Sequence, residues 1–233
     1  MTPQNISASK YKDILHQLKS LADPKAVAGM VRFGINPKNT YGVSIPKLRK
    51  LAKEIGINHA LAKKLWLSRI HEVRILASMI DDFEKVTEKQ MEDWVKDFDS
   101  WDVCDQVCLN LFAKTRHAYY KCIDWSLRKE EFVKRAGFAL MACLAVGDKD
   151  AEDKQFEVFF PLIKREAQDE RNFVKKAVNW ALRQIGKRNL PLNTKAITVC
   201  EQLQKAEAKS AKWIATDAFK ELTSRAVQKR LKK

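Results

Sequence analysis

The chain has 233 residues, enough for one large domain or two small ones and for a full hydrophobic core. Lysine and arginine total 44 against 29 aspartates and glutamates, so the formal net charge is +15 and favours a polyanion such as DNA, RNA or an anionic membrane surface. A basic soluble enzyme without such a partner is the plainer alternative. Only 7 glycines and 6 prolines are present, which argues against the frequent turns of a β-sandwich.

The apolar segments and the cysteines bear on the compartment. No stretch approaches the roughly 18 consecutive apolar residues that span a bilayer, and the N-terminus MTPQNISASKYKD lacks the apolar run of a secretory signal. The five cysteines are odd in number and lie mostly among apolar residues, which predicts buried, reduced thiols in a cytoplasmic protein. Cys104 and Cys108 have the spacing of half a zinc site, but the four histidines supply no matching pair, so no metal is expected.

Apolar residues recur with the 3.6-residue period of a helix along nearly the whole chain, and no segment alternates convincingly as a strand would. Helix starts are marked by Ser44, by Thr87 with Gln90 in a capping box, and by Ser100. One break is expected at NLPLN (189–193). The pattern predicts an all-α protein with helices at 9–21, 24–33, 45–55, 58–68, 71–81, 88–98, 101–113, 116–127, 130–146, 152–167, 170–188, 193–206, 209–222 and 224–231.

A weak internal repeat runs through these helices. Each copy has an acidic or amide residue one or two positions before a Val, which is followed by one or two basic residues and an apolar helix. The copies are HEVRILASMID (71–81), EFVKRAGFALMA (131–142) and NFVKKAVNWALRQIG (172–186). A unit of about 40 residues is typical of HEAT-like helix pairs, which stack into a curved superhelix with a concave surface. We therefore expect a single HEAT-like domain over residues 1–233, with a plain helical bundle as the alternative.

In the helix predicted at 170–188, Trp180 lies at the edge of the apolar stripe, since successive residues rotate by about 100°. The stripe consists of Val174, Ala177, Val178, Ala181 and Ile185. On the other flank of Trp180 lies a basic strip of Lys176, Arg183 and Lys187. Basic side chains beside an exposed aromatic suit a phosphate backbone with a sugar or base packed on the ring. A half-buried tryptophan whose edge is covered by solvated lysine stems is the alternative.

The helix predicted at 130–146 is apolar nearly all round, which predicts an inner position in the stack. Arg135 lies at the edge of its stripe. A guanidinium on an inner helix needs an anion, which is either a partner carboxylate or a phosphate.

In the helix predicted at 101–113, Trp101 and Asp105 stand one turn apart at the rim of the apolar stripe. Asp102 lies on the polar side in the first turn, where the helix dipole favours a carboxylate. Asp105 is less well placed for that interaction. The Trp101–Asp105 pair is therefore either ordinary surface or part of a functional site.

Five pieces of sequence carry a resemblance to a known family. They are GMVRFGI (29–35), YGVSIPKLRKLAKEIG (41–56), SWDVCDQV (100–107), FVKRAGFALM (132–141) and NFVKKAVNWALRQIGKRN (172–189). Taken in order, they resemble the AlkD-like DNA alkylation repair family, the HEAT-like alkylpurine DNA glycosylases. The resemblance implies a hydrolase that cleaves the N-glycosidic bond of cationic alkylated purines, such as 7-methylguanine and 3-methyladenine, in duplex DNA without flipping the base. It also implies a basic concave groove for the DNA.

The resemblance also implies roles for single residues. The family's pair of an aromatic and a carboxylate matches Trp101 and Asp105, and its second tryptophan matches Trp180. Asp105 is thereby expected to stabilise the oxocarbenium-like sugar and to orient water, with the two tryptophans as a cradle. Asp102 stays an alternative to Asp105 as the catalytic carboxylate.

Phosphate contacts are implied for basic side chains that match the family, and Lys176 joins them as part of the basic strip. The matching residues are Arg135, Arg183 and Lys187. Two positions depart from the family. Phe33 stands where a tyrosine is expected and loses a hydroxyl, and Cys143 stands where the family can carry a lysine and removes one positive charge from the groove. These departures would change affinity or lesion range.

Two other functions stay open. A non-catalytic protein that binds bent or branched DNA is expected to lack the Trp–Asp pair, so its presence counts against that function. A protein-interaction scaffold would use its concave face for a protein partner, and strong salt dependence of DNA binding would separate the two. For the enzyme, no cofactor is implied. We expect a monomer that binds alkylated double-stranded DNA and no membrane, in the cytoplasm and on the nucleoid when bound.

Overall fold

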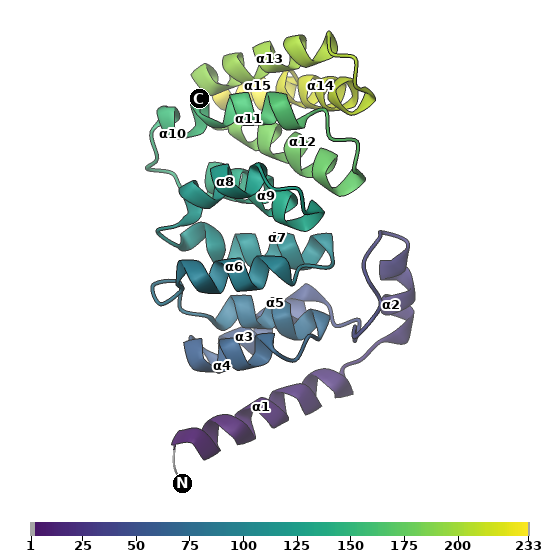
Figure 1. The fold of residues 1–233 in the computed structure, drawn as a ribbon, viewed down its shortest axis with the longest axis vertical. Coiled ribbons are helices and arrows are strands. Elements are labelled where there is room, and N and C mark those ends of the chain that lie inside the picture. Colours follow the sequence, from purple (N-terminus) through teal and green to yellow (C-terminus); the bar gives the residue numbers. More distant parts are fainter. Residues whose placement is uncertain (1–2, 233) are drawn as a thin grey trace. The chain divides into compact units, whose positions relative to one another are not determined.

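A computed structural model describes the backbone of residues 3–232 and the side chains of residues 10–232. Within that range the chain is helical throughout, with α-helices α1 to α15, one short 3₁₀ helix and no strand (Figure 1). The predicted all-α class is therefore confirmed. The chain divides into two compact units, Met1–Thr115 and Arg116–Lys233, which we call the N-terminal and the C-terminal unit. The single domain expected over the whole chain stays a prediction.

In the N-terminal unit, the inner helix α5 packs against α3, α4 and α7. Its residues from His71 to Ser78 are all buried. On the outer side, Trp66 of α4 stacks on Trp94 of α6 with 4.0 Å between ring centroids. The elements of this unit are α1 (Pro3–Ser20), α2 (Pro24–Val31), α3 (Ile45–Ile55), α4 (His59–Trp66), α5 (His71–Ile80), α6 (Glu88–Lys96), α7 (Trp101–Asn110) and η1 (Phe112–Lys114).

The loop between α2 and α3 is fastened to the first turn of α5 by the carboxylate of Glu72. Glu72 is 1% exposed, and its two oxygens accept backbone N–H bonds from Tyr41 at 2.9 Å, Gly42 at 2.6 Å and Val43 at 3.2 Å. The carbonyl of Asn39, which has a left-handed φ of 57°, accepts the backbone N–H of His71. Backbone donors that are removed from water need such partners, and Glu72 satisfies three of them in this loop.

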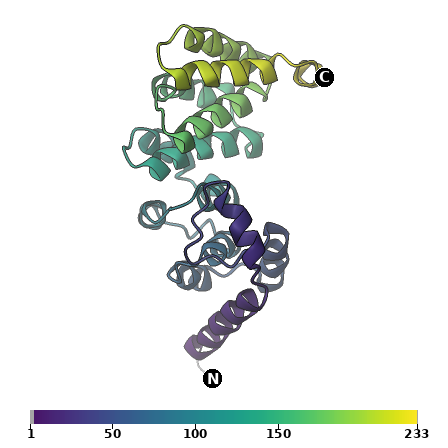
Figure 2. The same cartoon turned by 90° about the vertical axis from the view of Figure 1, so that its right-hand side faces the viewer.

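In the C-terminal unit, the inner helix α12 packs against α9 on one side and α14 on the other. The helix α9 is buried along nearly its whole length, so its predicted inner position is confirmed. The helices α13 and α14 form a hairpin, from which the short α15 turns away (Figure 2). The elements are α8 (Ala118–Ser126), α9 (Glu131–Gly147), α10 (Asp153–Glu157), α11 (Phe159–Glu166), α12 (Asn172–Gly186), α13 (Leu190–Gln204), α14 (Lys209–Leu222) and α15 (Arg225–Leu231).

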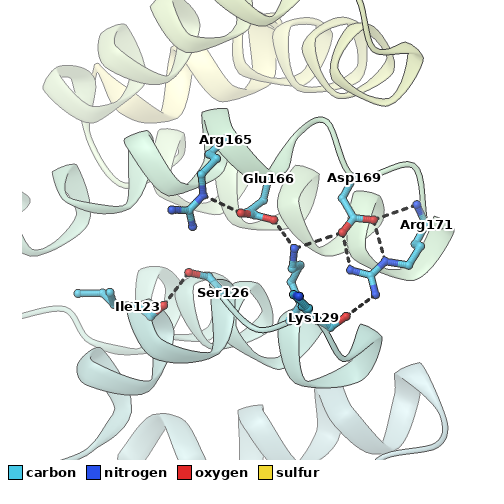
Figure 3. A network of polar contacts seen from close by, with 8 residues as sticks. Ile123, Ser126, Lys129, Arg165, Glu166, Asp169 and Arg171 are labelled. Carbon is cyan, nitrogen blue, oxygen red and sulfur yellow. Dashed lines mark hydrogen bonds and ion pairs between the residues drawn. The ribbon is translucent and has the colours of Figure 1, made fainter.

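A charged network joins the α8–α9 hairpin to the connection between α11 and α12 (Figure 3). The ammonium of Lys134 on α9 contacts Glu166 and lies 3.4 Å from Asp169. Arg171 pairs with Asp169 at 2.5 Å and donates to the carbonyl of Lys129 at 2.7 Å. The network therefore uses both side chains and backbone to hold consecutive helix pairs in register.

Close approach of α8 and α9 depends on Gly137. A Cβ built at this position would lie 2.6 Å from the backbone nitrogen of Ser126. Although alanine is intrinsically the better helix former by about 1 kcal/mol, the contact is with backbone and cannot be relieved by a rotamer change. We expect Gly137→Ala to lower the free energy of unfolding by about 1–3 kcal/mol in urea titrations. Gly147→Ala is the control in the same helix, because its Cβ would meet nothing within 4 Å and stability should hold or rise slightly.

Several predicted helix bounds differ from the structure; the first helix, for example, begins at Pro3 and not at residue 9. The segment predicted as one helix at 152–167 is two helices, α10 and α11, separated at Val158. The break predicted at 189–193 is present but lies earlier and is shorter, between the end of α12 at Gly186 and the start of α13 at Leu190, where the side chain of Asn189 accepts the N–H of Leu192. Pro191 is tolerated there because the first turn of a helix needs no donor at that position.

All five cysteines are buried thiols, as the sequence predicts. Among the residues that the structure describes, no helix is long and apolar enough to cross a membrane.

Candidate active site

The N-terminus of α7 carries the tryptophan and the carboxylate that the sequence singles out. Trp101 and Asp105 are half-buried, whereas the apolar face of α7 is buried. That face consists of Val103, Cys104, Val107 and Cys108. The predicted rim position of the pair is therefore confirmed. Both side chains stand on the same helix, one turn apart, where an aromatic ring and a carboxylate can act on one group.

Trp101 is held in place by the segment that follows α2. Its indole Nε1 donates to the carbonyl of Phe33 at 2.9 Å, while the Phe33 ring is 72% exposed. A second bond, from Asn36 Nδ2 to Asp99 at 3.1 Å, joins the same segments. Because α2 has no buried residue, these two bonds are important in placing Phe33 beside Trp101. The aromatic ring at position 33 is thus presented to solvent without a hydroxyl.

Asp102 is committed to the structure. One of its oxygens lies 2.8 Å from Nε2 of the buried His71, and the other accepts the hydroxyl of Ser100 and the N–H of Val103. The expected side-chain cap at Ser100 is therefore replaced by a bond to Asp102. Of the two carboxylates that the sequence leaves open, Asp102 thus has a structural role, and the catalytic role of Asp105 stays a prediction.

The two pKa values in this pair move apart. Burial opposes a charge on His71, but the hydrogen bond and the negative charge of Asp102 outweigh it, with Glu72 and Asp99 adding, so the pKa of His71 is raised. Burial also opposes the charge on Asp102, yet His71 and the hydrogen bonds from Ser100 and Val103 lower its pKa. Each group therefore holds the other in its charged form.

The raised pKa of His71 predicts a pH-dependent stability. The stabilisation of the fold by protonated His71 is complete below about pH 6.5, the pKa of histidine in the unfolded chain. It is lost as pH rises through the higher pKa of His71 in the folded chain. We expect the free energy of unfolding to fall as pH is raised from about 6.5, and His71→Gln to flatten this slope. His16→Gln, at an exposed position on α1, should leave the slope unchanged. Urea titrations across the pH range would measure both, and equal slopes in the His71→Gln and wild-type proteins would contradict the role of the pair.

The helix α12 carries the second tryptophan and the basic strip. All five residues of its predicted apolar stripe are buried, and Trp180 at the stripe's edge is half-buried as expected. Lys176 is exposed. Arg183 and Lys187 are instead turned toward α14, where their cationic groups lie 2.6 Å and 2.5 Å from the two oxygens of Glu221.

Glu221 is well stabilised in its charged form. Burial raises the pKa of this carboxyl, but the hydrogen bond from Lys187 and the charges of Arg183 and Lys187 outweigh burial and lower it. Sequence periodicity missed this partner because it lies more than 30 residues further along the chain. The available signal was the acidic pair Asp217 and Glu221, one turn apart on a helix.

Arg135 is 5% exposed on α9 and donates from Nη1 to the carbonyl of Phe173 at 2.6 Å. One of the arginine's donors is thus used on backbone between α9 and α12 within the C-terminal unit. Phosphate binding by Arg135 stays a prediction.

The family is settled by comparison with known proteins. The model of a family described as DNA alkylation repair enzyme matches residues 14–222. The chain belongs to this DNA alkylation repair enzyme family. The resemblance carried by the five sequence pieces is thereby confirmed, and DNA repair is its functional class.

Solved structures place the fold of this DNA alkylation repair family member. One described as "a new family of proteins related to the HEAT-like repeat DNA glycosylases with affinity for branched DNA structures" is 18% identical, with 95% of each chain covered and a TM-score of 0.78. A designed armadillo repeat protein is 16% identical over 76% of this chain and 92% of its own, with a TM-score of 0.36. No curated protein matches. The solved structure with the TM-score of 0.78 confirms the HEAT-like fold.

Within this DNA alkylation repair fold, the candidate residues fall into two groups. Trp101 and Asp105 share α7 of the N-terminal unit. The C-terminal unit holds Arg135 on α9, and Lys176, Trp180, Arg183 and Lys187 on α12. The role of each residue stays a prediction, as does a basic groove.

Proposed function

We propose that this chain is a monofunctional DNA glycosylase that removes cationic alkylated purines, such as 7-methylguanine and 3-methyladenine, from double-stranded DNA. The observation that carries the proposal is the half-buried pair of Trp101 and Asp105, one turn apart on α7. It occurs in a member of a DNA alkylation repair family, at the position where that family's aromatic and carboxylate pair is matched.

Cleavage of the N-glycosidic bond of a cationic purine requires few catalytic groups from the protein. Alkylation at N3 or N7 gives the purine a positive charge, so the base can leave with the bonding electrons of the N-glycosidic bond and become neutral. The sugar then develops oxocarbenium character at C1′, and water adds there and loses its proton. A carboxylate fixed near C1′ stabilises the developing charge and orients the water, which is the role proposed for Asp105. Because the leaving base needs no protonation, neither a cofactor nor a second acid is required.

Residues of both units have proposed roles in the reaction or in DNA binding. The N-terminal unit supplies Asp105 and the ring of Trp101, which favours cationic character over its face. The C-terminal unit supplies the ring of Trp180 and phosphate contacts from the basic residues Arg135, Lys176, Arg183 and Lys187. We propose that the protein acts as a cytoplasmic monomer that associates with the nucleoid through its substrate, and that the lesion stays in the duplex during the reaction.

The test is base release from methylated duplex DNA by the purified protein. We expect free 7-methylguanine and 3-methyladenine in the supernatant by chromatography, and a strand that breaks only after mild alkali. The alkali step distinguishes an intact abasic site from strand cleavage by the protein. Cleavage without alkali, or no release of either base, would contradict a monofunctional glycosylase.

A second candidate is a non-catalytic protein that binds branched DNA. It is favoured by the solved structure of similar fold, whose described property is affinity for branched DNA structures. Tighter binding to a four-way junction than to a duplex of equal length, together with no base release, would support this candidate over the glycosylase.

A further inference from the structure

The basic strip on α12 already has an anion bound to it. The carboxylate of Glu221 places one oxygen 2.6 Å from Nη1 of Arg183 and the other 2.5 Å from Nζ of Lys187. The two cations stand one turn apart on the same helix face, and the carboxylate bridges them. A phosphodiester presents two non-bridging oxygens in a comparable way, so the site that Glu221 fills has the chemistry of a phosphate site.

The surrounding residues bring the charge of this site to balance. Asp217, one turn before Glu221, lies 3.6 Å from Arg183 and accepts the side-chain N–H of Asn179 at 2.6 Å. Two cations, Arg183 and Lys187, thus face two carboxylates, and their positive charges are balanced in the folded chain. The three bridged side chains are 17–30% exposed, which leaves them accessible to a ligand.

The bridge does not satisfy Arg183 completely. Its Nε is buried and has no hydrogen-bond partner among the described residues. A guanidinium offers five donors in a fixed fork, and an unpaired buried donor favours any rearrangement that gives it a partner. An anion that also accepts a hydrogen bond from Nε would therefore bind Arg183 more favourably than Glu221 does.

We propose that Glu221 is a built-in competitor of DNA, which occupies the Arg183–Lys187 phosphate site in the free protein and is displaced by a phosphodiester when DNA binds. This inference rests on the DNA-binding function proposed above and adds a regulation to it. The competitor weakens binding to any duplex, because each binding event must first break two ion pairs. Prolonged occupation of undamaged DNA is thereby reduced.

The experiment is the affinity of the full chain for a short undamaged duplex, measured by fluorescence anisotropy at fixed salt. We expect Glu221→Gln, which keeps the shape and removes the charge, to bind about tenfold more tightly than wild type, equivalent to about 1.4 kcal/mol. Glu207→Gln makes the same change of net charge at an exposed turn between α13 and α14 and should raise affinity far less. Glu221→Ala should behave as Glu221→Gln and guards against an effect peculiar to glutamine.

A double-mutant cycle shows whether the effect runs through the two cations. In a chain carrying Arg183→Ala and Lys187→Ala, Glu221→Gln should have no more effect than Glu207→Gln. Equal affinities of wild type and Glu221→Gln, including no binding by either, overturn the proposal. Weaker binding by Glu221→Gln also overturns it and makes Glu221 a residue that positions the cations. Base release is tested separately, so the two proposals can fail independently. If the protein releases bases but Glu221→Gln does not change DNA affinity, only the competitor proposal is refuted. If Glu221→Gln raises DNA affinity but the protein releases no bases, only the glycosylase proposal is refuted.

Discussion

Replacement of Asp105 by asparagine is expected to lower base release by about 10²–10⁴-fold, with DNA affinity close to that of wild type. Asparagine keeps the size of the side chain and its place on the rim of α7 but removes the negative charge that stabilises the sugar. Single-turnover release of 7-methylguanine measures the chemical step, and anisotropy with the same duplex measures binding.

Asp102→Asn is the matched control, since the same change is made one turn away on the same helix. Its oxygens hold His71 and Ser100, so its loss should lower the thermal midpoint while base release at a temperature where the protein is folded stays within a fewfold of wild type. If Asp102→Asn abolished release and Asp105→Asn did not, the catalytic group would be Asp102. If neither affected release, the pair on α7 would have no part in the chemistry.

Glu72→Ala is expected to cause the largest loss of stability among single substitutions proposed for this chain. The change removes the acceptor of three backbone N–H groups at Tyr41, Gly42 and Val43. The Val43 donor is buried and the other two are partly buried. An unsatisfied buried donor costs about 1–3 kcal/mol, so the free energy of unfolding should fall by about 3 kcal/mol in total. Urea denaturation gives the magnitude, and limited proteolysis should show new cleavage between α2 and α3.

An ordinary surface carboxylate provides the comparison. Asp93 on α6 pairs with Lys89 at 2.7 Å, and both side chains are more than half exposed. Asp93→Ala should change the free energy of unfolding by no more than about 0.5 kcal/mol, as is usual for exposed helix pairs. A loss below about 1 kcal/mol for Glu72→Ala would mean that water replaces the carboxylate as the acceptor for this loop.

The parts of the structure that depend on local sequence could be predicted. The period of apolar residues identifies the buried face of α12 and the rim position of Trp180, because burial along one helix repeats every 3.6 residues. The same reasoning identifies α9 as an inner helix and places Trp101 and Asp105 together. It fails at α10 and α11, because apolar residues continue the period on both sides of Val158, where the helix is interrupted.

The partners of the charged residues could not be predicted in the same way. Lys187 and Glu221 are 34 residues apart, and His71 and Asp102 belong to different helices of the N-terminal unit. Which of them meet depends on how helix pairs stack, and helical periodicity contains no information on that. The sequence therefore indicated a basic strip on α12, whereas the folded chain pairs two of its three members with a carboxylate.

The burial of the cysteines has a consequence for a protein whose family repairs alkylated DNA. Alkylating agents are electrophiles, and in proteins the thiolate is the nucleophile they meet most readily. Burial raises the pKa of Cys200 to about 12 and that of Cys122 well above its usual value, so these groups stay in the unreactive thiol form at neutral pH. The other three sulfurs are equally shielded from solvent. The buried thiols of this chain should therefore resist alkylation by the same agents that produce the DNA lesions its family repairs.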